Sequence, residues 1–79
     1  MFEYTKEELQ AIRQARLKEL IEVAGGPTML ARIMGISINT VMGWHVRGQI
    51  SKQGARLIPT LKNEAIKNRF SPEYLRPDL

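Results

Sequence analysis

The stretch "LARIMGISINTVMGW", residues 30–44, decides the fold, because it joins two helical apolar patterns at Gly35-Ile36-Ser37. Glycine accepts a left-handed turn and serine is a strong N-cap, so we predict that one helix ends here and another begins at Ile38. The spacing is typical of a helix-turn-helix, with a small residue, a turn glycine four positions later, and apolar residues six and nine positions after it. The predicted core of this motif is Leu30, Ala31, Gly35, Ile36, Val41 and Trp44.

Cap signals extend the helical prediction towards the N-terminus. Thr5-Lys6-Glu7-Glu8 has the form of a capping box, and apolar residues then recur at near-helical spacing as far as Ala24. We therefore predict an amphipathic helix from Lys6 to Ala24 within an N-terminal segment, residues 1–25. Pro27 suits the first turn of the second helix, which we expect to run from Pro27 to Met34. The third helix is expected to run from Ile38 to about Val46.

The C-terminal segment, residues 51–79, shows further helix starts. Ser51 can cap a helix from Lys52, and Pro59 either kinks that helix or starts a fifth one from Thr60 to about Lys67. Ser71-Pro72-Glu73 predicts a short turn ending near Leu75. Strand periodicity and internal repeats are absent from the sequence. We predict an all-α single domain over residues 1–79, a compact bundle of about five short helices with the helix-turn-helix at 27–46.

Composition excludes several classes of protein. The chain has 79 residues, enough for one small core, and no cysteine, which excludes disulfides and thiolate chemistry. Its one histidine, His45, has no partner at metal-ligand spacing, so we expect no metal. No apolar run approaches the ~20 residues of a membrane span, and "MFEYTKEELQ" lacks the features of a signal peptide. We expect a cytoplasmic protein with no membrane contact.

Charge is distributed unevenly along the chain. Residues 1–25 carry four basic and five acidic side chains, a net charge of −1, whereas residues 26–79 carry eight basic and three acidic ones, a net charge of +5. Between Glu22 and Glu64 there is no acidic residue. Such a long stretch of one sign favours a polyanionic partner, although a mildly basic surface is also common in proteins without one.

Residues 26–59, together with "SPEYLRPDL" at the end, resemble the Cro/YdaS-like family of phage and prophage repressors. The resemblance rests on "GISINTVMGWHVRGQIS", with its Gly-Ile-Ser, Val, Trp and basic residue in order, and on the closing Leu-Arg-Pro-Asp. It implies a lambda-repressor-like DNA-binding fold, binding to a double-stranded DNA operator, and usually a homodimer. The sequence departs from the family at Pro27, where members often carry a glutamine that contacts the DNA backbone.

Helical geometry assigns residues of the third helix to faces. Val41 and Trp44 turn inward, and the opposite face would enter the major groove with its N-terminal half against base edges. The predicted base-reading residues are Ile38, Asn39, Met42 and Gly43. Asn39 can pair with adenine, and Ile38 and Met42 can pack on thymine methyl groups. The predicted contacts to the DNA backbone are Thr28, Arg32, Ser37, Thr40, Arg47, Lys52 and Arg56.

Other functions stay open at this point. Asn39 can be an exposed residue near a helix start, and the pair Ile38 and Met42 fits a protein interface equally well. A helical protein-interaction module, such as an antirepressor or adaptor, is therefore an alternative, as are a phage-type activator or excision factor on the same motif. Dimerisation has two candidate surfaces, the first helix and the segment after Pro59. No catalytic motif is present, so we expect no enzyme, no cofactor and no small-molecule ligand.

Overall fold

A computed structural model describes residues 4–79, so the first three residues of the predicted segment 1–25 lie outside the described part. Its elements are α1 (Lys6–Ala24), α2 (Pro27–Met34), α3 (Ile38–Arg47), α4 (Lys52–Leu57), the 3₁₀ turn η1 (Ile58–Thr60), α5 (Glu64–Arg69) and α6 (Pro72–Leu75). Residues 4–79 contain no strand, which confirms the all-α prediction. Residues 4–79 form six α-helices and a 3₁₀ turn where about five short helices were predicted, and the sixth helix, α6, is the predicted short turn that ends near Leu75.

Local capping explains why the first helices begin and end where the sequence predicts. The Thr5 side chain accepts a hydrogen bond from the Glu8 amide at 3.1 Å, and Glu8 Oε1 accepts one from the Thr5 amide at 3.1 Å. This reciprocal pair is the predicted capping box, and it satisfies two amides that the helix itself leaves unpaired. The bounds of α1 and α2 agree with the prediction, and α3 continues one residue beyond Val46.

The region around Pro59 corrects the sequence prediction. No helix runs from Thr60 to Lys67, because Pro59 lies in the 3₁₀ turn η1 and Leu61 then takes an extended conformation with φ −73° and ψ 149°. The next helix starts only at Glu64, where the Asn63 side chain accepts a hydrogen bond from the Ile66 amide at 3.1 Å. Asn63 is a good N-cap, and that local signal was available in the sequence.

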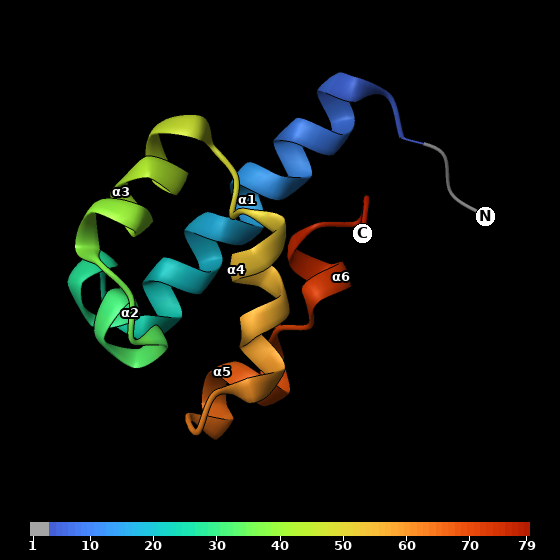
Figure 1. Cartoon of the computed structure of the whole chain (residues 1–79). Helices are drawn as coiled ribbons and strands as arrows, with labels where there is room; N and C mark the ends of the chain where they lie inside the picture. Colours follow the sequence, from blue (N-terminus) through green and yellow to red (C-terminus); the bar gives the residue numbers. More distant parts are fainter. Residues whose placement is uncertain (1–3) are drawn as a thin grey trace.

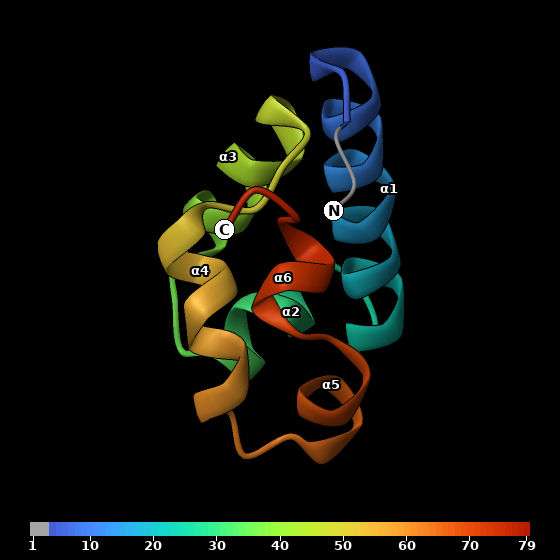
Figure 2. The same ribbon diagram turned by 90° about the vertical axis from the view of Figure 1, so that its right-hand side faces the viewer.

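The core lies where the later part of α1 meets α2, α3, α5 and α6, and α4 packs against α6. Figure 2 shows α6 between α1 and α4, so the end of the chain packs over the middle of the molecule. The buried apolar residues are Leu17, Leu20, Ala24, Leu30, Ala31, Met34, Val41, Trp44, Ile50, Ala55, Ile58, Ile66, Phe70 and Leu75. Helices α1, α2 and α3 contribute three, three and two of them, and α4, α5 and α6 contribute one each, so α2 and α3 are held as part of one core.

The predicted amphipathic character of α1 applies to only part of the helix. Leu17, Leu20 and Ala24 are buried, whereas Leu9 and Ile12 are only half-buried and do not belong to the core cluster. The reason is geometrical, because the first turns of α1 extend beyond the body formed by the other helices (Figure 1). A sequence pattern shows which residues share a helix face, but it does not show how far the neighbouring elements reach.

Candidate functional site

The turn between α2 and α3 fixes the direction of α3. Gly35 has φ 67° and ψ 33°, a left-handed conformation that other L-residues adopt at a cost. The amides of Gly35 and Ile36 donate to the carbonyls of Arg32 and Ala31 at 3.2 and 3.0 Å. The Ser37 hydroxyl then accepts a hydrogen bond from the Asn39 amide at 3.1 Å. The end of one helix and the start of the next are therefore both fixed by local contacts.

The inner side of this pair of helices is apolar. Leu30, Ala31, Val41 and Trp44 are buried, and the half-buried Ile36 packs against the same core. These are the residues that the sequence assigns to the motif core, apart from the turn glycine. Because residues of both α2 and α3 are buried in one cluster, the two helices pack as one unit.

Gly54 is a structural requirement that the sequence analysis missed. A Cβ atom on Gly54 would lie 2.5 Å from Cζ2 of Trp44, so only glycine lets the first turn of α4 lie against the indole ring. Ser51 caps α4 at the same point, accepting a hydrogen bond from the Gly54 amide at 2.9 Å. The available signal was a glycine three residues after a cap, inside a helical pattern. This contact holds α4 beside α3. Lys52, the first residue of α4, follows the Ser51 cap directly.

The outer face of α3, by which we mean Ile38, Asn39, Met42, Gly43 and Val46, points away from the core. Ile38, Met42 and Val46 are 38, 40 and 82% exposed. Asn39 is exposed and Gly43 is half-exposed. The face thus combines one amide side chain with three apolar ones, and the structure leaves all of it open apart from the neighbourhood of Gly43.

Arg47 covers the space beside Gly43. A Cβ atom on Gly43 would lie 3.4 Å from Nη1 and 3.7 Å from Nη2 of Arg47. The guanidinium of this last residue of α3 therefore lies one turn back along the helix. The sequence predicted Arg47, just after the expected end of the helix, as a contact to the DNA backbone and did not show that its side chain would lie beside Gly43.

The residues predicted to contact a DNA backbone all lie at the surface. Thr28 and Arg32 are exposed on α2, and Ser37 and Thr40 are exposed at the start of α3. The structure brings Thr40 beside Ser51, at a hollow of about 220 Å³ between α3 and α4 that is also lined by Ile36, Trp44, Gln53, Gly54 and Leu57. Lys52 and Arg56 are exposed on α4. Thr28 and Arg32 are not among the residues that line this hollow.

Four of the surface cations around α3 have no side-chain partner in the described part of the chain. Among residues 4–79, no hydrogen bond or ion pair involves the side chains of Arg32, Arg47, Lys52 or Arg56. Acidic residues are also absent from the sequence between Glu22 and Glu64. The positive charge around α3 is therefore not neutralised locally, and it remains available to an anion.

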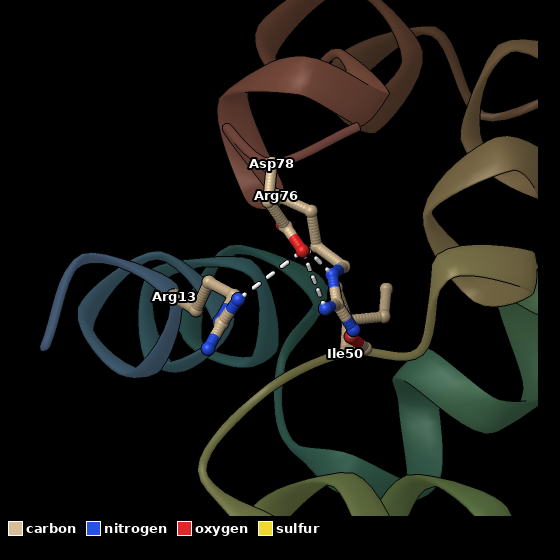
Figure 3. A network of polar contacts seen from close by, with 4 residues as sticks. All are labelled: Arg13, Ile50, Arg76 and Asp78. Carbon is tan, nitrogen blue, oxygen red and sulfur yellow. Dashed lines mark hydrogen bonds and ion pairs between the residues drawn. The ribbon is translucent and has the colours of Figure 1, made fainter. Parts of the chain in front are cut away.

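A second polar cluster, which the sequence analysis missed, joins the end of the chain to α1 (Figure 3). Arg76 donates two hydrogen bonds to the Asp78 carboxylate, at 3.2 and 2.8 Å, and one to the Ile50 carbonyl at 2.9 Å. Arg13 of α1 lies 3.2 Å from the same carboxylate. The hydrogen bonds from Arg76 hold the pKa of Asp78 at about 2, below its ordinary value of 3.8, and the charge of Arg13 contributes.

Tyr74 extends this cluster along α1. Its hydroxyl donates to Glu19 at 2.7 Å, a bond that raises the pKa of Tyr74 above its ordinary value. Arg16 donates to the Tyr74 carbonyl at 2.7 Å and lies 4.2 Å from the centre of its ring. Arg69 pairs with Glu19 at 3.6 Å. We call these contacts the C-terminal seam, formed by Arg13, Arg16 and Glu19 with Arg69, Tyr74, Arg76 and Asp78.

The seam and the core together use most of the C-terminal segment. Phe70 and Leu75 are 2 and 0% exposed, so they pack into this chain's own core.

His45 is exposed beside a hollow of about 190 Å³ lined by Gln14, Leu17, Lys18 and Gly48. Across residues 4–79, acidic and histidine side chains nowhere gather in threes as a metal site requires. No helix of the described part is long and apolar enough to cross a membrane.

The exposed outer face of α3 and the unpaired cations around it are thus the candidate site. A comparison of the chain with protein-family models, with curated proteins and with solved structures gives no match.

Proposed function

We propose that this chain is a sequence-specific regulator of transcription that binds double-stranded DNA through α3. In this proposal α2 and α3 form a helix-turn-helix, and α3 lies in the major groove of a near-palindromic operator. The chain acts as a homodimer, with the two copies of α3 about one DNA turn, ~34 Å, apart. The regulator is a Cro-like repressor, which blocks transcription by occupying its operator.

The single observation that carries the proposal is the position of Asn39. It lies exposed near the start of α3, on the side opposite the buried Val41 and Trp44. A rigid helix that presents an amide near its N-terminal end suits recognition of adenine, whose edge offers one donor and one acceptor in the major groove. The cap at Ser37 and the turn at Gly35 hold this end of the helix in a defined direction.

The composition of the surrounding surface supports the same proposal. Exposed hydroxyls and unpaired cations border the outer face of α3, and contacts of these kinds position a protein on phosphates without reading sequence. The exposed Ile38 and Met42 fit the methyl groups of thymine. The half-buried Leu9 and Ile12 on the projecting part of α1 offer apolar surface for dimerisation.

The test is selection of binding sites from random duplex DNA, followed by titration of the selected site at two salt concentrations. We expect an enriched near-palindrome whose affinity falls steeply with salt, because each neutralised phosphate releases counterions. A protein making 6–10 phosphate contacts loses about 10³- to 10⁵-fold in affinity between 50 and 200 mM salt. Failure to enrich any sequence would refute specific DNA binding.

The exposed apolar residues of α3 favour a second candidate, a protein-interaction module such as an antirepressor or adaptor. Val46 is 82% exposed and lies on the same side as Met42, so a partner protein would bury both. Binding through such a surface responds weakly to salt, since few charges are neutralised. The salt titration therefore separates the two candidates, whereas the position of the operator relative to the promoter separates a repressor from an activator or an excision factor.

A further inference from the structure

The side chain of Arg47 folds back along α3 and lies over Gly43. The nearest atoms to a Cβ built on Gly43 are Nη1 and Nη2 of Arg47, at 3.4 and 3.7 Å, followed by Cζ at 3.8 Å. The outer atoms of the guanidinium, Nη1, Nη2 and Cζ, therefore border the space that a side chain at position 43 would fill. Helical side chains incline towards the N-terminus, so an arginine can reach back one turn when the earlier residue leaves room.

This position brings the guanidinium onto the outer face of α3. Successive residues turn by about 100° around a helix, so Gly43 lies about 40° from Asn39, whereas the Cα of Arg47 lies about 80° away. By folding over Gly43, the side chain moves from the edge of the face towards Asn39. It also moves towards the N-terminal half of α3, which is the half that approaches base edges in a helix-turn-helix.

The N–H donors of the guanidinium are also free in the described part of the chain. Within residues 4–79 it has no hydrogen-bond or ion-pair partner, and Arg47 is exposed. The arginines of the C-terminal seam, by contrast, are engaged with carboxylates or carbonyls. A planar group with parallel N–H donors beside a reading amide has a natural complement in the O6 and N7 atoms of guanine.

We infer that Arg47 is a specificity-determining residue that reads a guanine in the major groove. Gly43 has no side chain and so leaves the space, which we call the slot, in which the guanidinium lies. The inference rests on the proposed function and deepens it, because it adds one guanine to each half-site, near the base read by Asn39. The assignment differs from a phosphate contact in what it predicts. A phosphate contact supports every sequence equally, whereas a guanine contact discriminates at one base pair.

The first experiment measures affinities for the selected operator and for its single-base variants, with the wild-type chain and with Arg47→Ala. We expect the wild type to discriminate about 5- to 150-fold in favour of guanine at one position of each half-site. Arg47→Ala should bind all four bases at that position with similar affinity and keep its preferences elsewhere. Replacing that guanine by 7-deazaguanine, which lacks the N7 acceptor, should weaken the wild type and leave Arg47→Ala unchanged.

Variants at Gly43 test the slot without removing the charge. Gly43→Ala adds only a methyl group, 3.4 Å from Nη1 of Arg47, so it should reduce the guanine preference less than a larger side chain does. Gly43→Leu fills the slot with a large side chain. It should abolish the preference for guanine at that one base pair of the half-site and leave the preferences at other base pairs unchanged. Both changes raise helix propensity at a half-exposed position, so circular dichroism should show an intact fold.

Two outcomes overturn the inference, and they are distinguishable. If Arg47→Ala weakens every sequence by the same factor and lowers the salt slope by about one, Arg47 contacts a phosphate and the proposed function stands. If the selection enriches no sequence at all, both the proposed function and the reading of guanine are wrong.

Discussion

The outer face of α3 and the C-terminal seam use the same kinds of side chain in opposite ways. In the seam, Arg76 contacts both Asp78 and the Ile50 carbonyl, so its charge serves the fold. Around α3, the cations on α2, α3 and α4 contact no acceptor within residues 4–79. The difference teaches that net charge alone does not locate a binding surface. What matters is which charges the fold has already neutralised.

The largest expected effect breaks the seam. Arg76→Met removes the hydrogen-bond donor to both Asp78 and the Ile50 carbonyl and leaves Asp78 with Arg13 alone, so the free energy of unfolding should fall by about 3 kcal/mol. The matched control is Arg47→Met, which removes an exposed arginine that has no partner among residues 4–79 and should cost less than about 0.5 kcal/mol. Chemical denaturation measures both. Equal losses in the two variants would contradict the distinction between the two regions.

The next effect concerns the turn that directs α3. Gly35→Val places a β-branched residue at φ 67°, and we expect a loss of about 1–3 kcal/mol in the free energy of unfolding. Gly35→Asn is the control, because asparagine tolerates the left-handed conformation and should retain most of the stability. Thermal unfolding of the two variants gives the comparison, and an unchanged melting temperature for Gly35→Val would argue against this turn.

Acid should weaken the seam before it affects the outer face of α3, which carries no carboxylate. The pKa of Asp78 is depressed in the folded chain, to about 2, so its ionised form is bound more tightly there than in the unfolded chain. This contribution is present above pH 3.8 and is lost as the pH falls towards 2. We expect the free energy of unfolding to fall by about 1–2 kcal/mol over this range. This is less than the full linkage value because solvent partly screens the carboxylate.

The control for this pH dependence is Asp78→Asn, which cannot ionise. Its free energy of unfolding, measured by denaturant titration from pH 5 to pH 2, should decline less than that of the wild type. Parallel declines in the two proteins would show that Asp78 does not carry the effect.

The smallest expected effect on stability comes from Asn39→Ala, on the outer face of α3. Asn39 is exposed, so the free energy of unfolding should change by less than about 0.5 kcal/mol. Binding should lose discrimination at one base pair by about 5- to 150-fold, while affinity for other sequences changes little. Operator preference is measured as for Arg47→Ala. An unchanged preference would remove Asn39 from the set of reading residues.

Much of the fold was predictable because its signals are local. Caps at Thr5, Ser37 and Ser51, together with the glycines that end the first helices, fixed most helix bounds from neighbouring residues alone. The error after Pro59 has a local cause as well, since Asn63 was overlooked as the cap of α5. The burial of Val41 and Trp44 followed from helical periodicity.

The remaining features depend on contacts between distant parts of the chain. The close approach of Gly54 to Trp44 and the reach of Arg13 to Asp78 join residues whose spacing in the sequence carries no regular pattern. The same holds for Leu9 and Ile12, whose exposure depends on where the other helices end. No periodicity or capping rule specifies such pairs.

The sequence by itself determined the all-helical fold, the turn at Gly35 and the sign of the charge around α3. The first two follow from backbone preferences, and the third from the numbers of acidic and basic residues. Only the tertiary structure decided which arginines are neutralised by the fold and which remain free, because pairing requires two groups within about 4 Å. The position of Arg47 beside Gly43 depends on both the sequence and the tertiary structure, because helix geometry lets an arginine reach back one turn, whereas its rotamer depends on the space that its neighbours leave.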